Sequence, residues 1–136
     1  NSQKMLETND QNNPTGRFLD LATKPFDFSK PKKCPSIIDT TFVLEKENEF
    51  SASLFSKKNN LKMTVYTDQP AVHIYVGGNC FNTIKGKENE DYDSLSGICF
   101  ETQNFPDAPN HEHFPSSVLK KEETYHHKTI YKFQSF

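Results

Sequence analysis

The chain has 136 residues, a formal net charge of −2, 12 Phe, 5 Tyr and a hydrophobic fraction of 33%. This length allows one domain at most, scattered basic residues argue against a nucleic-acid partner, and no apolar run approaches the roughly 18 residues of a membrane span. The aromatic content indicates a packed core, but one so lean that we expect the chain to be part of a larger domain.

The first half of the chain has the pattern of an all-β protein. A Pro-Thr-Gly turn signal at 14–16 precedes a short apolar segment at 18–21. β-branched and aromatic residues predict a strand at 37–44. Residues 50–55 alternate apolar and small polar side chains, and 57–60 indicate a hairpin-like connection. We therefore expect consecutive antiparallel strands here, with no sustained helical period.

The second half continues the pattern. Alternation at 61–66 predicts another strand, and Asp-Gln-Pro at 68–70 turns the chain into a strand at 71–76. The charged stretch 85–96 indicates an exposed loop, and the last strand is expected at 125–133. These elements predict an all-β fold for the whole chain.

Glu101 lies in an alternating segment that ends in a proline-containing loop. Ile98 and Phe100 form one face of this predicted strand, and Cys99, Glu101 and Gln103 form the other. Glutamate is depleted in strands and is seldom buried without a partner. Glu101 is therefore a candidate for acting on a ligand, with an ordinary solvated strand face as the alternative.

Polar residues on two other strands are candidates for a sugar site. His73 and Tyr75 share the face opposite the aliphatic residues of 71–76, and together they offer a hydrogen-bonding tip and an aromatic wall. Sugars present hydroxyls and apolar C–H faces, which suit such a mixed surface. Asp39 stands alone among apolar and hydroxyl residues. The alternatives are a surface histidine on a half-exposed strand and a carboxylate that caps a backbone group.

We expect neither a metal nor a cofactor. The histidines at 111–113 and 126–127 show no convergent ligand set of the kind a metal requires. The three cysteines, Cys34, Cys80 and Cys99, do not have the spacing of a metal or redox motif. We therefore expect reduced thiols in a cytoplasmic protein.

Residues 97–110 (Gly-Ile-Cys-Phe-Glu-Thr-Gln-Asn-Phe-Pro-Asp-Ala-Pro-Asn) resemble a family signature. It is that of the galactose mutarotases, or aldose 1-epimerases, in which Leu- or Phe-Glu-Thr-Gln-Asn leads into Pro-Asp. The resemblance implies a large antiparallel β-sandwich of which residues 1–136 supply the C-terminal strands. Other segments align with the family in the same order: 13–16, 25–28, 38–44, 65–70, Tyr75 with Gly77, 114–115, and 125–127 with 131–133.

The resemblance implies a mutarotase that interconverts the α and β anomers of hexoses such as galactose and glucose. The family glutamate at the position of Glu101 acts as general base on the anomeric hydroxyl, while a histidine protonates the ring oxygen. By the same resemblance Asp39 would hydrogen-bond sugar hydroxyls. His73 stands where family members often have a sugar-contacting glutamine.

The chain also departs from the family pattern. Thr40 and Thr41 replace the usual His-Asn, and residues 76–78 differ from the usual Thr-Gly-Asn. The two catalytic histidines of the family lie upstream of the matched region, and none of the five histidines here aligns with either. We therefore expect this chain to bind a hexose together with a missing upstream half, on the same polypeptide or a separate chain. A non-catalytic carbohydrate-binding sandwich is the alternative.

Overall fold

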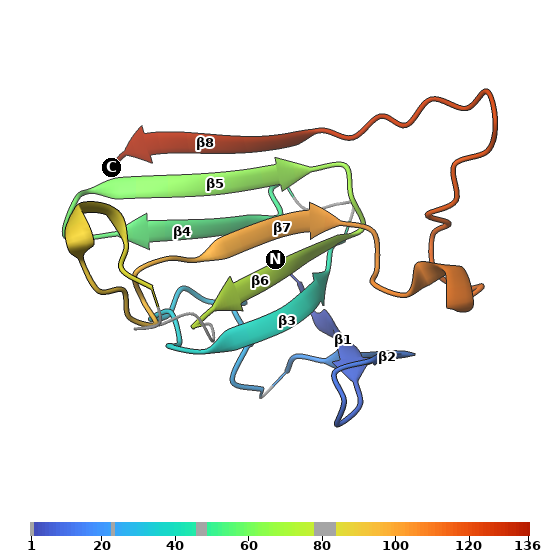
Figure 1. Cartoon of the computed structure of the whole chain (residues 1–136), viewed down its shortest axis with the longest axis horizontal. Coiled ribbons are helices and arrows are strands. Elements are labelled where there is room, and N and C mark those ends of the chain that lie inside the picture. The colour runs from blue at the N-terminus through green and yellow to red at the C-terminus, as the bar shows by residue number, and fades with distance from the viewer. Residues whose placement is uncertain (1, 23, 46–48, 78–83) are drawn as a thin grey trace.

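The computed structural model describes residues 2–22, 24–45, 49–77 and 84–136, which form two antiparallel sheets (Figure 1). The larger sheet has the strand order β2-β1-β3-β6-β7, and the smaller has the order β4-β5-β8. This arrangement confirms the all-β antiparallel fold. The strands are β1 (Lys4–Thr8), β2 (Pro14–Asp20), β3 (Ile38–Val43), β4 (Ala52–Ser56), β5 (Leu61–Thr67), β6 (Ala71–Val76), β7 (Cys99–Gln103) and β8 (Thr129–Ser135).

The main core lies between the two sheets. Strand alternation places aliphatic and aromatic side chains of β3, β6 and β7 on the inner face of the larger sheet, where they meet side chains of β4 and β5. The buried members are Leu21, Ile38, Phe42, Ala52, Val65, Val72, Ile74, Val76 and Phe100. Because the side-chain period is two, the polar neighbours of these residues face outward.

Strand β6 lies inside the larger sheet, with β3 on one side and β7 on the other. Both pairs are antiparallel, and their register sets which outward side chains are neighbours. A slip of one residue would turn these side chains into the core. Two outward rows cross the three strands: Asp39, Tyr75 and Cys99 in one, and Thr41, His73 and Glu101 in the other.

A second, smaller core covers one end of the outer face of the larger sheet. After β7 the chain turns through the short helix η2 (Ala108–Asn110) and places Phe105 and Phe114 against Phe18 of β2. The ring centroids of Phe105 lie 4.8 Å from Phe114 and 5.1 Å from Phe18. This cluster, completed by Leu6 and Ala71, holds residues 104–115 onto the sheet beside the two outward rows.

The last strand begins at Thr129, later than the expected start at residue 125. The reason lies in a distant turn: both carboxylate oxygens of Asp68 accept hydrogen bonds from the backbone N–H of Lys128, at 3.1 and 3.0 Å. A ring nitrogen of His127 is 2.9 Å from the same carboxylate. Hydrogen bonding from the Lys128 backbone, and after it from the His127 side chain, holds the pKa of Asp68 below its ordinary value.

The start of the chain also differs from the expectation. Residues 4–8 form β1, which the sequence did not indicate, and residues 14–16 belong to β2 rather than to a turn. The turn is at Asn9–Asn13, where the Asn9 side chain accepts hydrogen bonds from two backbone N–H groups and Asn12 has a φ of 61°. Proline is tolerated at the first residue of a strand, which explains its place in β2.

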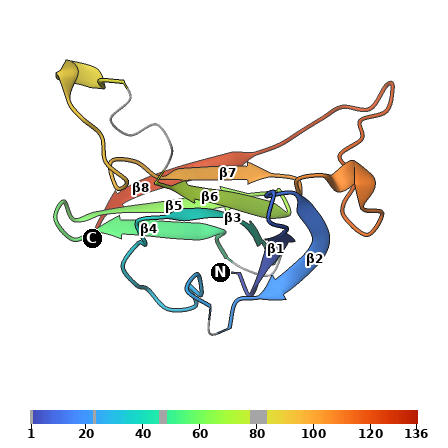
Figure 2. The same ribbon diagram turned by 60° about the horizontal axis from the view of Figure 1, so that its bottom comes forward.

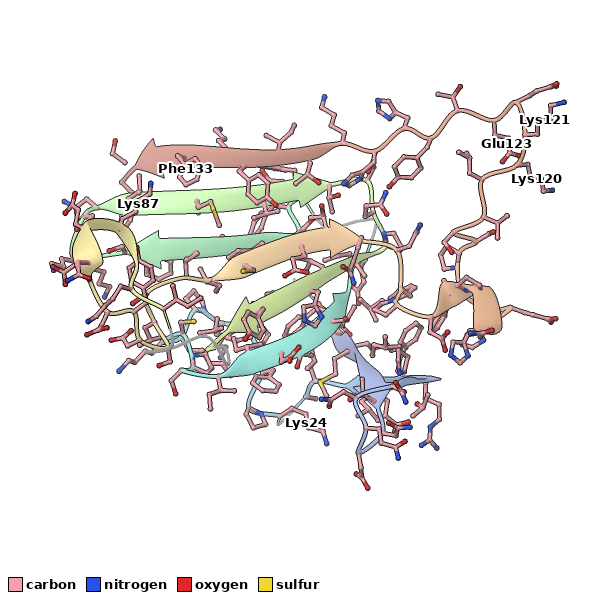
Figure 3. All side chains as sticks on the ribbon, viewed as in Figure 1. Lys24, Lys87, Lys120, Lys121, Glu123 and Phe133 are labelled. Carbon is pink, nitrogen blue, oxygen red and sulfur yellow. The ribbon has the colours of Figure 1, made fainter. Side chains whose placement is uncertain are left out.

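Two segments project away from the sheets (Figure 2). One carries the short helix η1 (Lys87–Asn89) within the charged stretch that was expected to be an exposed loop. The other runs from η2 to β8, and Figure 3 shows Lys120, Lys121 and Glu123 at its far end.

None of the helices in the described ranges has the length and apolar character required to span a membrane.

Candidate active site

The structure brings all four predicted site residues to the outer face of the larger sheet. Asp39 lies on β3, His73 and Tyr75 on β6, and Glu101 on β7. The inward neighbours of His73, Val72 and Ile74, are 1% and 8% exposed, which anchors the outward orientation. The sheet therefore forms a rigid support for a polar surface made by three adjacent strands.

His73 is tied to β3 through both nitrogens of its ring. Nε2 is 2.9 Å from Oδ1 of Asp39, and Nδ1 is 2.8 Å from Oγ1 of Thr41. Thr41 is directly opposite His73 in the β3–β6 register, and Asp39 is its diagonal neighbour. Diagonal neighbours are within reach of long side chains, so the sheet geometry accounts for both contacts.

Glu101 is directly opposite His73 on the other side of β6 and is exposed. Across the described part of the chain, its carboxylate makes no hydrogen bond or ion pair. A carboxylate in this state can accept a proton or a hydroxyl hydrogen bond from a ligand. The geometry therefore supplies a positioned acceptor with rigid backbone beneath it.

The second core bounds this polar surface at one end. Thr41 is only 5% exposed, although it shares the outward face with Asp39, which is 64% exposed at its side chain. Phe105 and Phe114 belong to the cluster that packs at this end of the face. The surface thus has one covered, apolar end, while both carboxylates remain exposed.

A cavity of about 770 Å³ lies on the opposite side of the sheet and is not this site. Its lining comes from the inner faces of both sheets and includes Ile38, Phe42 and Val72, with no carboxylate among the described residues. Cys34 also lines it, and burial raises the pKa of that thiol. The lining is mainly apolar, although the segment 26–34 and four lysines also contribute to it, and it offers no carboxylate among the described residues for acid–base chemistry.

The other histidines lie away from the two outward rows. His111 is 3.3 Å from a carboxylate oxygen of Asp107, and Nε2 of His113 is 2.8 Å from the backbone oxygen of Gly16. His126 and His127 precede β8. Within the described ranges, no group of three or more His, Cys, Asp or Glu side chains could hold a metal.

Thr41 is a site residue that the sequence analysis missed. It was noted only as a departure from the family pattern, yet it binds one nitrogen of His73. The signal that could have identified it is its spacing of two from Asp39, which places both on one face of a strand.

Known proteins share sequence and fold with this chain. A family model described as aldose 1-epimerase matches residues 1–132. Galactose mutarotase from Bos taurus is 37% identical over 130 residues, which cover 88% of this chain and 38% of that protein. Aldose 1-epimerase from Escherichia coli (strain K12) is 30% identical over 100 residues, which cover 70% of this chain and 29% of that protein.

A solved structure is also similar. The crystal structure of the GalM/aldose epimerase homologue from C. elegans matches with a TM-score of 0.88 and 24% identity, over 98% of this chain and 44% of that chain. The present chain therefore spans less than half the length of each of these relatives. The fold is shared with that homologue, and the family model covers nearly every residue. The chain belongs to the aldose 1-epimerase family.

Proposed function

We propose that this chain carries the general base and part of the sugar-binding face of an aldose 1-epimerase acting on hexoses such as galactose and glucose. One observation carries the proposal: the Glu101 carboxylate, which has no hydrogen-bond or ion-pair partner among the described residues, lies opposite His73 and on the same face as Asp39. Tyr75, beside Asp39 in the register, supplies an aromatic surface for the sugar ring. The relatives named galactose mutarotase and aldose 1-epimerase support the same reaction.

The reaction requires one base and one acid on opposite sides of the sugar ring. Glutamate carboxylates are ordinarily ionised at neutral pH, so Glu101 would take the proton of the anomeric hydroxyl. An acid gives a proton to the ring oxygen, the bond between C1 and that oxygen breaks, and C1 becomes an aldehyde carbon. Rotation about C1–C2 and the reverse proton transfers close the ring on the other face.

We propose that the acid comes from upstream strands that complete the sandwich, with residues 1–136 as its C-terminal portion. The open apolar cavity between the sheets supports this, as does exposed aromatic surface on β8, where Phe133 is 61% exposed (Figure 3). Strands β7 and β8 are both edges of their sheets and can accept further strands. This chain matches less than half of the length of these relatives, so their remaining sequence is long enough to contain such strands.

Polarimetry of fresh α-galactose with the 136-residue chain alone tests whether the general acid lies outside this chain. We expect the rotation to change no faster than in buffer, because the base has no acid partner. A substantial rate with the chain alone would contradict the proposal. In parallel, a galactose titration followed by amide NMR should shift residues of the outer face of β6 and β7 in a saturable way.

A sugar-binding module without turnover is the second candidate. It is favoured by the state of the histidines: both ring nitrogens of His73 are engaged, and the other four lie in loops. The module predicts two results for a complete protein. Glu101→Gln should change the galactose affinity, and the mutarotation rate should stay at the buffer level in both the wild type and the variant. An enzyme should lose rate with little change of affinity.

A further inference from the structure

His73 has no ring nitrogen left for a ligand. A carboxylate can only accept, so Nε2–H donates to Oδ1 of Asp39 at 2.9 Å. In a neutral imidazole Nδ1 is then an acceptor, and the Thr41 hydroxyl donates to it at 2.8 Å. If the ring is doubly protonated, Nδ1–H donates to the same hydroxyl oxygen. In either state a sugar hydroxyl could bind a ring nitrogen only by displacing Asp39 or Thr41.

Thr41 fixes the ring from the protected side of the site. The residue is 5% exposed, and it belongs to the same strand as Asp39. The His73 side chain is 22% exposed, whereas that of Asp39 is 64% exposed. A well-buried hydroxyl therefore orients a partly buried ring, and the ring in turn orients an accessible carboxylate.

Asp39 is the member of this chain of contacts that can meet a ligand. His73 occupies Oδ1, which leaves Oδ2 and the remaining lone pair of Oδ1 to accept hydrogen bonds from hydroxyls. Without the imidazole, an exposed carboxylate on a short side chain would rotate among its rotamers. Ordering one such side chain on binding would then weaken affinity by about two- to tenfold.

We infer that His73 is a positioning residue, which holds Asp39 in the orientation that receives the sugar hydroxyls and does not bind the sugar itself. This inference rests on the proposed function as far as the sugar is concerned. The Thr41–His73–Asp39 relay, meaning these three residues and their two hydrogen bonds, exists without a ligand and can be tested without one.

The first test uses the wild-type chain and no sugar. Nitrogen-15 NMR of the imidazole at about pH 8, where histidine rings are ordinarily neutral, reports which nitrogen carries the proton. We expect His73 to be fixed as the Nε2–H form, and Thr41→Val to change the Nδ1 signal. A fixed Nδ1–H form, or the averaged signal of a ring that exchanges freely between the two, would overturn the relay.

The second test is a double-mutant cycle on the galactose dissociation constant. His73→Phe should weaken binding about two- to tenfold in the wild-type background and have no effect when Asp39 is already alanine. His73→Gln should retain most of the affinity, because its amide N–H can still donate to Asp39. His126→Phe, a change outside the sheets, is the matched control. Equal weakening by His73→Phe in both backgrounds would show direct sugar binding and overturn the inference.

The two proposals fail in distinguishable ways. If the wild-type chain binds no galactose at any accessible concentration, the sugar-binding assignment fails and so does the positioning role. If galactose binds and the cycle is additive, the face is a sugar site and only the role given to His73 is wrong. The tautomer of His73 is measured on the wild-type protein, and that part of the NMR test does not depend on whether a variant folds.

Discussion

Replacing Phe105 with alanine should destabilise the chain strongly, because this ring is buried in the second core. Phe105 is 6% exposed, and its centroid lies 4.8 Å from Phe114 and 5.1 Å from Phe18. Truncating a buried phenylalanine typically costs about 3–5 kcal/mol. Each aromatic contact contributes about 0.5–1.5 kcal/mol beyond buried area, so two lost contacts favour the upper half of that range.

The assay is urea unfolding followed by circular dichroism. With a slope of about 2 kcal/mol per molar, a loss of about 4 kcal/mol lowers the midpoint by about 2 M. Phe105→Leu, which keeps most of the apolar volume, should fall between wild type and alanine and remains measurable if the alanine variant is unfolded. Phe133→Ala is the matched control, since that ring is 61% exposed and should lose less than about 1 kcal/mol.

Equal shifts for the Phe105 and Phe133 alanine variants would refute the reasoning. They would mean that the packing of residues 104–115 onto the sheet adds little to stability. The closed end of the candidate site would then have no energetic basis in the second core.

Two further predictions concern the frame around the site. Because the pKa of Asp68 is lowered in the folded chain, its ionised carboxylate stabilises the fold above the unfolded pKa of about 3.9. This stabilisation is lost as the pH falls from there through the lower folded pKa. The urea midpoints of wild type and Asp68→Asn should therefore differ at pH 5 and converge toward pH 2, whereas a constant gap would contradict the assignment. Gly77 has a φ of 77°, and a Cβ there would lie 2.3 Å from the backbone oxygen of Ser36, so Gly77→Ala should lose at least about 1–2 kcal/mol of unfolding free energy. Gly97→Ala, with nothing within 4 Å of the added carbon, should leave the free energy of unfolding unchanged or raise it by about 0.4–1 kcal/mol. A Gly97→Ala variant less stable than Gly77→Ala would contradict this prediction.

Strands with strong alternation were predictable from the sequence. The expected segment 71–76 coincides with β6. The outward placement of His73, Tyr75 and Glu101 follows from the alternation of side chains between the two faces of a strand. Strand β1 was missed because its sequence, Lys-Met-Leu-Glu-Thr, carries only one fully buried residue, Leu6. Its pairing with β2 and β3 defines it as a strand, and that pairing is not a local property.

The contacts within the site could not be predicted, because they depend on register between distant strands. Asp39 and His73 are 34 positions apart, and only the antiparallel pairing of β3 with β6 makes them diagonal neighbours. The same holds for Glu101, whose place opposite His73 follows from the pairing of β6 with β7. The start of β8 was misplaced for a similar reason, since a carboxylate in a distant turn binds the backbone just before Thr129.

The assignment of Glu101 as general base is the centre of this account, and polarimetry on a complete protein tests it most directly. In a chimera, this chain would replace the matching part of the Bos taurus relative, and the rest of that protein would supply the strands that we propose to lie upstream. We expect Glu101→Gln to lower its galactose mutarotation rate by about 10²–10⁴-fold, the usual contribution of a general base. Glu123→Gln, at the far end of a projecting segment, is the matched control and should leave the rate unchanged (Figure 3). A folded Glu101→Gln chimera that retains most of the rate would contradict the account.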